Sequence, residues 1–263
     1  MHDCLIAFGS NEGSPQDVYQ AALDRLEQSV QVEVVANSKP FETSPVGGPE
    51  GQGNYLNAAI RIATELEPDQ LHQQLVAIEN ELGRQRRTRW GSRKIDLDLL
   101  LFDELEFNSE RLTVPHPRMS FRRFVLEPAG EIAGEMIHSP SGLSLAQLLT
   151  NLEQRKDLVL GVYDERFSVF FDEIGSEVAD HHPAWSFRVV PGLDEWEQYV
   201  DQAKLVTYFV MDDHGSAPVS DSARGAKALR LAAREFAGAT LRLPKEADRA
   251  LTEILAAIDG MQA

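Results

Sequence analysis

The sequence predicts an α+β fold: a ferredoxin-like βαββαβ domain with an antiparallel sheet, followed by a smaller C-terminal α/β domain. Apolar spacing over residues 3–102 follows the order strand, helix, strand, strand, helix, strand. Pro15 and Pro68 stand where the two predicted helices begin. Beyond about residue 155, strands alternate with helical segments. We therefore expect one domain over residues 1–157 and a second over residues 158–263.

Local signals place the elements of the first domain. Ser14-Pro15 combines an N-cap residue with proline at the first helical position, and Gly83 suits the end of the second helix. We expect the helices to cover one face of the sheet and to leave the other face open for a site. The expected elements are a strand over residues 3–8, a helix from Pro15 through Val30, strands over residues 32–36 and 55–64, a helix from Pro68 to Leu82, and a strand over residues 95–102.

The second domain contains neither the Gly-x-x-x-x-Gly-Lys-Ser/Thr phosphate loop nor the Gly-x-Gly-x-x-Gly fingerprint. Its last helix could bury an intramolecular core or a dimer contact, so self-association through this domain is one alternative. The role of the domain stays open. Its expected strands are residues 158–163, 167–171, 186–190 and 205–211, and its expected helical segments lie near residues 194–203, 221–237 and 245–260.

Composition argues against several classes of protein. The formal net charge is −17, whereas a nucleic-acid binder normally carries a basic surface, so we expect no nucleic acid partner. The longest strongly apolar run, Leu99–Phe102, is too short to span a membrane, and the N-terminus lacks the pattern of a secretory signal. Cys4 is the only cysteine, which excludes an intrachain disulfide. We expect a cytoplasmic protein that does not associate with membranes.

One segment departs from the acidic balance. Gly83–Lys94 carries six Lys or Arg residues and no acid. In an acidic protein this concentration indicates a site for a small polyanion, although a solvated basic loop is the alternative. Trp90 lies within the segment and is either a stacking lid or a hydrophobic anchor for the loop.

The acids Asp96 and Asp98 follow this basic segment. Residues i and i+2 of a strand point to the same face, so the two carboxylates repel unless cations lie between or above them. A solvent-facing strand is the alternative for a bare Asp-x-Asp pattern. Here Leu99–Phe102 is apolar on both faces, which favours a central strand, where unpaired acids are costly. The pair therefore predicts a Mg²⁺ site next to arginines that bind a polyphosphate.

Two weaker patterns complete the candidate site. Tyr55 and Asn57 share one strand face, where a ring beside an amide can hold a flat heterocycle, although ordinary strand packing is the alternative. His116 stands between two prolines in Val114-Pro115-His116-Pro117, which could aim its imidazole at a phosphate or simply form a turn.

Six blocks of residues, in order and at family-like spacing, resemble 6-hydroxymethyl-7,8-dihydropterin pyrophosphokinase over about residues 3–155. No single motif is as specific as this combination. The blocks are Phe8-Gly9-Ser10-Asn11, the Ser44–Gly47 loop with Asn54–Ala59, Glu79, Arg89-Trp90-Gly91-x-Arg93, Asp96-Leu97-Asp98-Leu99, and Leu112–Pro117.

The resemblance implies an enzyme that moves a diphosphate from ATP to the hydroxymethyl-dihydropterin, with AMP leaving, as a step of folate biosynthesis. It implies two Mg²⁺ ions held by Asp96 and Asp98, which join Arg84 and Arg93 as catalytic residues. The implied pterin contacts are Ser44, Pro45, Val46, Tyr55, Asn57, Trp90 and Phe124. The implied ATP contacts are Glu79, Arg84, Arg89, Arg93, Leu99, Arg111, Thr113, His116 and Arg122.

Two departures from the family pattern stand beside this resemblance. The loop between Arg84 and Trp90 is about one residue shorter than in the best-known bacterial form, and Pro117 occupies a place where some members carry tyrosine. Three rival functions remain: a ferredoxin-like nucleic-acid-binding module, a metal-dependent nucleotide hydrolase, and a catalytically inactive scaffold. The acidic balance opposes the first, and the intact acids and arginines oppose the last.

Overall fold

The computed structural model describes residues 1–46, 49, 51–84, 92–162, 168–190, 202–209, 239–243 and 247–263. The chain divides into two compact units. The N-terminal unit comprises Met1–Leu149 with Asp259–Ala263, and the C-terminal unit comprises Thr150–Ile258. No helix in the described part of the chain is long and apolar enough to cross a membrane.

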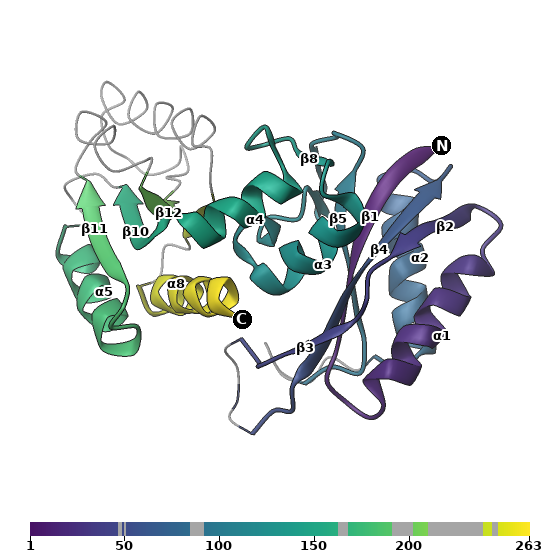
Figure 1. The fold of residues 1–263 in the computed structure, drawn as a ribbon, viewed down its shortest axis with the longest axis horizontal. Coiled ribbons are helices and arrows are strands. Elements are labelled where there is room, and N and C mark those ends of the chain that lie inside the picture. Colours follow the sequence, from purple (N-terminus) through teal and green to yellow (C-terminus); the bar gives the residue numbers. More distant parts are fainter. Residues whose placement is uncertain are drawn as a thin grey trace. The chain divides into compact units, whose positions relative to one another are not determined.

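The N-terminal unit is built on an antiparallel sheet, as predicted (Figure 1). The strand order is β2-β4-β1-β5, and a fifth, short strand, β3, pairs with β4. The predicted strand over residues 55–64 is confirmed, whereas β3 was not predicted because three residues are too few to show an alternating pattern. The strands are β1 (His2–Ser10), β2 (Val32–Asn37), β3 (Phe41–Thr43), β4 (Tyr55–Thr64) and β5 (Asp96–Phe102).

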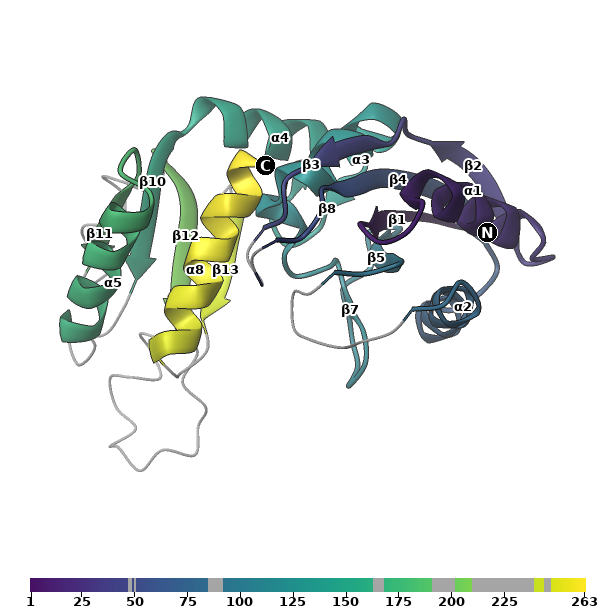
Figure 2. The same ribbon diagram turned by 90° about the horizontal axis from the view of Figure 1, so that it is seen from below.

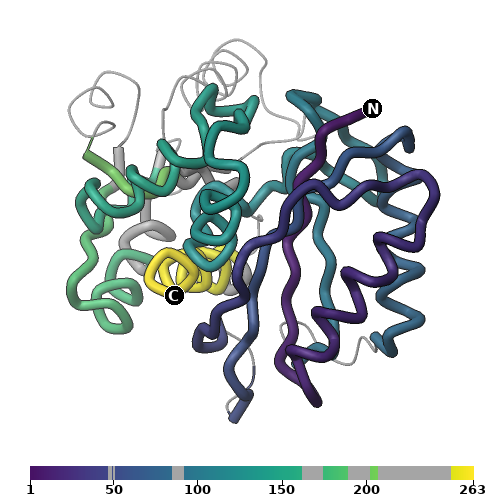
Figure 3. The backbone as a smooth tube through the Cα atoms, turned by 45° about the vertical axis from the view of Figure 1, so that its right-hand side comes forward, coloured from purple at the N-terminus to yellow at the C-terminus, as the bar shows by residue number. Residues whose placement is uncertain are grey.

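Helices α1 (Pro15–Glu27) and α2 (Pro68–Glu81) lie together on one face of this sheet (Figure 3). Both begin with proline, as predicted, and α2 starts with a capping box in which Gln70 Oε1 accepts the Glu67 backbone N–H at 2.9 Å. The prediction that the first helix continues through Val30 is wrong. The helix ends at Glu27, with Gln28 as its C-cap residue, and Val30 is fully exposed, so its helical spacing in the sequence did not mark a buried face.

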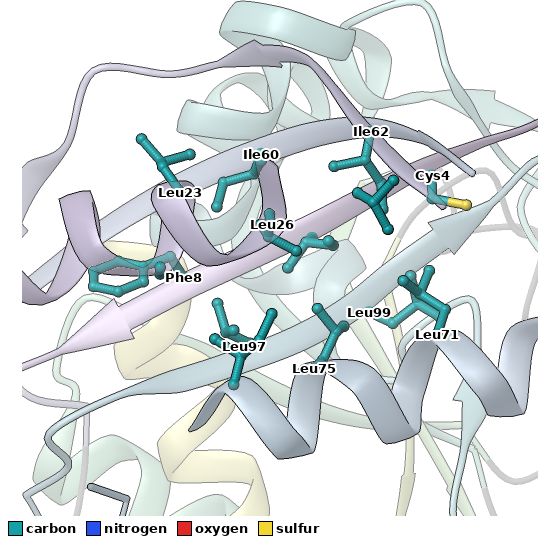
Figure 4. Close-up of a cluster of buried hydrophobic side chains, with 14 of the residues drawn as sticks. Cys4, Phe8, Leu23, Leu26, Ile60, Ile62, Leu71, Leu75, Leu97 and Leu99 are labelled. Carbon is teal, nitrogen blue, oxygen red and sulfur yellow. The ribbon is translucent and has the colours of Figure 1, made fainter. Parts of the chain in front are cut away.

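The core of the N-terminal unit lies between the sheet and these two helices. Alternate residues of β5 point into it, so that Leu97 and Leu99 face Leu71 and Leu75 of α2 (Figure 4). Because side chains alternate along a strand, Asp96 and Asp98, which alternate with these leucines, point to the opposite face. The core packing therefore directs Asp96 and Asp98 away from α2.

That opposite face is not open, which corrects the expectation that helices cover only one face. Helix α3 (Arg123–Ala133) packs against β4 and β1 there (Figure 1). Arg61 of β4 connects the two layers, since it donates to both carboxylate oxygens of Asp3 at 3.0 and 2.7 Å and to the Ile132 carbonyl at 3.3 Å. The smaller elements of this region are β6 (Phe107–Asn108), β7 (Thr113–Val114), η1 (Met119–Phe121), β8 (Ile137–His138), β9 (Leu143–Ser144) and α4 (Leu145–Gln154).

The C-terminal unit contains a parallel sheet in the order β11-β10-β12-β13, with α5 packed along β11 (Figure 2). The predicted strand over residues 167–171 is wrong, because Ser168–Phe171 form the first turn of α5. Phe and Val favour strands, but Ile174 and Val178 continue the apolar pattern at helical spacing. The elements are β10 (Lys156–Val162), α5 (Ser168–His181), β11 (Ser186–Val190), β12 (Ala203–Phe209), β13 (Ala239–Leu243) and α8 (Ala247–Gln262).

Other expectations for this unit have mixed outcomes. Strand β13 was not predicted. The helix expected near residues 245–260 is confirmed as α8, which begins and ends two residues later. The helical segment expected over 221–237 lies outside the described residues, as does most of the one expected over 194–203.

Candidate active site

The candidate site forms where one end of β1 meets the first residues of β4 and β5. Gly9 of β1 pairs with Asn57 of β4 on one side and with Asp96 of β5 on the other. A Cβ atom on Gly9 would lie 3.8 Å from Asn57 Oδ1 and 4.0 Å from Asp96 Cβ. The residue predicted to hold a heterocycle and a residue predicted to hold a metal therefore flank the same glycine, which has no side chain to separate them.

Asp96 is the centre of a cluster of charges. Its side chain is 15% exposed, Arg84 Nη2 lies 2.8 Å from Oδ1, and Arg93 Nη1 pairs with Oδ2. The contact with Arg84 is an ion pair without hydrogen-bond geometry. Asp96 Oδ1 is buried, and it accepts no hydrogen bond from the described residues. Burial raises the pKa of the Asp96 carboxyl, the charge of Asp98 raises it further, and the two arginines oppose both effects.

Asp98 lies two residues further along β5 and is 40% exposed, with Oδ2 3.8 Å from His116 Nε2. Burial, and then the charges of Arg122 and Arg118, lower the pKa of His116 to about 3. The imidazole is therefore neutral near pH 7, and the contact with Asp98 is not an ion pair. Because His116 Nδ1 accepts the Arg118 backbone N–H at 3.2 Å, we place the ring proton on Nε2, which faces Asp98.

Glu79 of α2 contacts both Arg84 and the start of β5. Its side chain is 1% exposed, accepts the Leu97 backbone N–H at 2.7 Å and pairs with Arg84 Nη1. Burial raises the pKa of Glu79, while Arg84 and the Leu97 N–H lower it. The turn that brings Arg84 back toward Glu79 uses Gly83 at φ +88, a left-handed conformation that glycine adopts without strain.

Two residues at the end of β1 hold the segment around Arg93. The Asn11 backbone N–H donates to the Arg93 carbonyl at 2.9 Å, and Asn11 Oδ1 accepts the Arg93 N–H at 2.7 Å. Asn11 Nδ2 donates to the Gly53 carbonyl at 3.2 Å, and Ser10 Oγ donates to the Lys94 carbonyl at 2.7 Å. Sequence reasoning assigned no role to these two residues, although both stand in the block Phe8–Asn11.

The residues predicted to hold the pterin lie at the neighbouring ends of β3 and β4. Asn57 is buried and its Nδ2 donates to Thr43 Oγ1 at 2.8 Å. Burial raises the pKa of Tyr55, and the charge of Arg93 lowers it. Ser44, Pro45 and Val46 continue directly from β3. Phe124, at the start of α3, has the Arg122 guanidinium 5.6 Å from its ring centroid.

The remaining predicted residues are less closely grouped. Leu99 points its side chain into the core shared with α2, which leaves only its backbone for a ligand. Arg111 and Thr113 belong to the β6–β7 hairpin, where both are exposed and Thr113 Oγ1 donates to Asn108 Oδ1 at 3.0 Å. Arg89 and Trp90 lie outside the described residues.

An α+β sheet that presents two neighbouring carboxylates, two arginines and a neutral histidine has the side chains that a phosphoryl-transfer enzyme uses, since this chemistry depends on charge neutralisation and positioning. A sequence model of the 7,8-dihydro-6-hydroxymethylpterin-pyrophosphokinase (HPPK) family matches residues 5–134.

Curated relatives agree with this match. The 2-amino-4-hydroxy-6-hydroxymethyldihydropteridine pyrophosphokinase of Haemophilus influenzae is 41% identical over 152 residues, which cover 58% of this chain and 91% of that protein. The enzyme of the same name from Bacillus subtilis is 46% identical over 131 residues, which cover 50% of this chain and 78% of that protein. The chain belongs to the HPPK family and is a pyrophosphokinase.

Among solved structures, a crystal structure of an HPPK-DHPS in complex with substrates is similar with a TM-score of 0.47 and 11% sequence identity. The similarity covers 88% of this chain and 61% of that one.

Proposed function

We propose that the chain transfers the diphosphate group of ATP to 6-hydroxymethyl-7,8-dihydropterin, giving the pterin diphosphate and AMP, as a step of folate biosynthesis. Membership of the family supports the reaction. The observation that carries the assignment of the site is the position of Gly9, because it brings the amide of Asn57 and the carboxylate of Asp96 to either side of one open backbone position.

The proposal includes two Mg²⁺ ions at Asp96 and Asp98. The donor set fits Mg²⁺, since both carboxylates lie on one strand face, Asp98 is 40% exposed, and Asp96 Oδ1 is a buried acceptor without a hydrogen bond from the described residues. No cluster of three or more metal-binding side chains occurs in the described part of the chain. Mg²⁺ suits a site with few carboxylates because it completes its coordination with water and phosphate oxygens. When bound, it would neutralise phosphate charge and polarise the phosphorus–oxygen bonds.

Positive charge for the phosphates would come from side chains, since the chain has no glycine-rich phosphate loop. Arg84 and Arg93 already lie at the carboxylates. Burial, and then the neighbouring Arg118, lower the pKa of Arg122 to about 10, so this arginine stays charged near pH 7. His116, being neutral, would donate its Nε2–H to a phosphate oxygen without adding charge.

In the proposed reaction, the diphosphate passes directly from ATP to the pterin. The hydroxymethyl oxygen of the pterin attacks the β-phosphorus of ATP and forms a new oxygen–phosphorus bond, while its hydroxyl proton passes to water. The bond from the β-phosphorus to the oxygen that bridges the α- and β-phosphorus atoms breaks, and this oxygen leaves as part of AMP. Arg84 and Arg93 would hold the phosphate oxygens in line and stabilise the charge that builds up on them. We assign no general base.

The pterin and adenine contacts complete the proposal. Asn57 would hydrogen-bond the edge of the pterin, which Ser44, Pro45 and Val46 would border through their backbone. The rings of Tyr55, Phe124 and Trp90 would lie against its faces. Backbone near Leu99, Arg111 and Thr113 would meet adenine, Glu79 would lie near the nucleotide, and Arg89 would approach the phosphates.

AMP release from ATP and Mg²⁺, measured with and without the hydroxymethyl-dihydropterin, tests this function. We expect release only when the pterin is present. Equal turnover of ATP without the pterin would identify a nucleotide hydrolase instead. Binding of oligonucleotides that weakens steeply with salt would favour the nucleic-acid-binding alternative.

Three further assignments belong to the same proposal. The strand order β2-β4-β1-β5 and the helices α1 and α2 support a ferredoxin-like arrangement of the first domain. We propose a cytoplasmic location and a second domain over residues 158–263. The mass of the full-length chain in solution, compared with the mass of a chain that lacks residues 160–263, tests whether the protein self-associates through this domain.

A further inference from the structure

Both carboxylate oxygens of Asp96 face a guanidinium group. Arg84 Nη2 lies 2.8 Å from Oδ1, and Arg93 Nη1 pairs with Oδ2. The Asp96 side chain is only 15% exposed, so water screens these charges weakly. A divalent cation that binds either oxygen of Asp96 therefore lies beside one of these guanidinium groups, which repels it.

The two arginines can leave Asp96 without becoming buried, unpaired cations. Arg84 also pairs with Glu79, which keeps a counter-charge beside it. The Arg93 side chain is 32% exposed, while its backbone is fixed by Asn11 Oδ1 at 2.7 Å. The Arg93 guanidinium can thus turn toward a ligand while its backbone stays in place.

Charge balance decides what can displace them. In the ion pairs of Glu79, Arg84, Arg93 and Asp96, two acids balance two bases. Asp98 and Arg122 lie near enough to act on these groups, and they add one charge of each sign. A free divalent ion would add positive charge beside the guanidinium groups. A divalent ion that arrives on phosphate groups brings acceptors for those groups, because the guanidinium fork matches phosphate oxygens.

We propose that Arg84 and Arg93 act as an internal counter-ion of Asp96, which opposes binding of free Mg²⁺ and admits the metal together with the phosphates to which the arginines transfer. The inference rests on the proposed function and adds to it the selection of the metal–nucleotide complex over the free metal. Since coupling between two ligands is reciprocal, the phosphates strengthen metal binding at Asp96 as much as the metal strengthens nucleotide binding.

Binding of Mn²⁺ to the full-length chain, followed through the electron paramagnetic resonance signal of the free ion, tests the inference without turnover. Mn²⁺ takes the same oxygen ligands as Mg²⁺. The titration is made with Mn²⁺ alone, and again with an ATP analogue that has a methylene bridge between the α- and β-phosphorus atoms. We expect Arg93→Gln to bind Mn²⁺ alone about fivefold more tightly than the parent. The factor by which the analogue strengthens Mn²⁺ binding should be about fivefold smaller in the variant than in the parent.

Arg25→Gln is the matched control, because Arg25 pairs with Glu81 on the surface of the same unit. It removes the same charge and should leave both affinities within about twofold of the parent. Arg84→Lys is a second variant. Its single ammonium group can still pair with Glu79, but it cannot pair with Glu79 and Asp96 at the same time as the two arms of a guanidinium group do. It should also bind Mn²⁺ alone more tightly, and circular dichroism should show both variants folded.

The outcomes separate this inference from the proposed function. If AMP release by the parent depends on the pterin, but folded Arg93→Gln and Arg84→Lys bind Mn²⁺ alone no more tightly than the parent, the function stands and the counter-ion inference is wrong. If the parent releases no AMP with the pterin, the function itself is wrong, whatever the variants bind.

Discussion

Glu79 accepts the backbone N–H of Leu97 at 2.7 Å, although the two residues are 18 positions apart in the sequence and the whole basic segment lies between them. The contact joins the last turn of α2 to the start of β5, and the same carboxylate pairs with Arg84. One buried acid therefore fixes the strand that carries Asp96 and the arginine that faces it.

Removing the charge of Glu79 should destabilise the N-terminal unit. In Glu79→Gln the amide oxygen can still accept the Leu97 N–H, but Arg84, whose side chain is 12% exposed, loses a buried counter-charge. Because Arg84 keeps Asp96 as a second partner, the loss should lie at the lower end of the cost of breaking a buried pair, about 3 kcal/mol, which urea unfolding monitored by circular dichroism would measure. Glu81→Gln, which affects only an exposed pair with Arg25, should cost less than about 0.5 kcal/mol. Equal losses in the two variants would contradict the role of Glu79.

The size of the side chain at position 9 should decide how much activity the enzyme keeps. A Cβ atom there meets Asn57 and Asp96 at ordinary contact distances, so Gly9→Ala should keep most activity. Gly9→Leu places a branched side chain between the pterin and phosphate sides of the site and should lower kcat/KM by about a hundredfold or more. Steady-state AMP release measures both variants. Full activity in folded Gly9→Leu would show that the substrates do not meet over this glycine.

The amide of Asn11 should matter for turnover more than for folding. Asn11→Ala removes the side-chain contacts to the Arg93 N–H and the Gly53 carbonyl, which costs about 1 to 2 kcal/mol of unfolding free energy. Because both contacts position segments that flank the site, kcat/KM should fall by at least about tenfold. Asn80→Ala, an exposed change on α2, is the control for both measurements. A drop in stability without a drop in kcat/KM would limit Asn11 to a structural role.

The charge state of His138 should make folding sensitive to acid. Burial lowers the pKa of His138 from 6.5 to about 4, so the folded protein favours the neutral ring. The resulting stability is complete above pH 6.5 and is lost as the pH falls from 6.5 toward 4, by at most about 3 kcal/mol. The free energy of unfolding of His138→Gln, measured by urea at several pH values, should fall less steeply across this window. Parallel pH profiles for parent and variant would contradict the assignment.

The strands and helices that show a clear period could be predicted from the sequence. The two acids of β5 alternate with Leu97 and Leu99, and this period of two places them on one face whatever lies nearby. The helices α1 and α2 were marked by proline and by apolar residues at helical spacing. Strand β3 was too short for any pattern, and Ser168–Phe171 have strand-favouring side chains within a helix whose identity depends on later residues.

The contacts that organise the site could not be predicted, because they join distant parts of the chain. Asn11 meets Arg93 across 82 residues, and nothing in the sequence near either residue indicates the other. The position of α3 on the second face of the sheet could not be predicted for the same reason. Nor does the sequence near Arg61 or Asp3 indicate the salt bridge between them. Residue types indicated the chemistry, while the sheet register determined which residues meet.

The rate of AMP release by Asp98→Asn tests the central claim most directly, that the paired acids of β5 hold the metal during diphosphate transfer. Asp98 is 40% exposed, so the amide should leave the fold intact, as a circular dichroism melt would show. We expect kcat to fall by at least about a thousandfold. Asp103→Asn, just past the far end of the same strand, should keep kcat within about twofold. A folded Asp98→Asn variant with kcat near that of the parent would contradict the account.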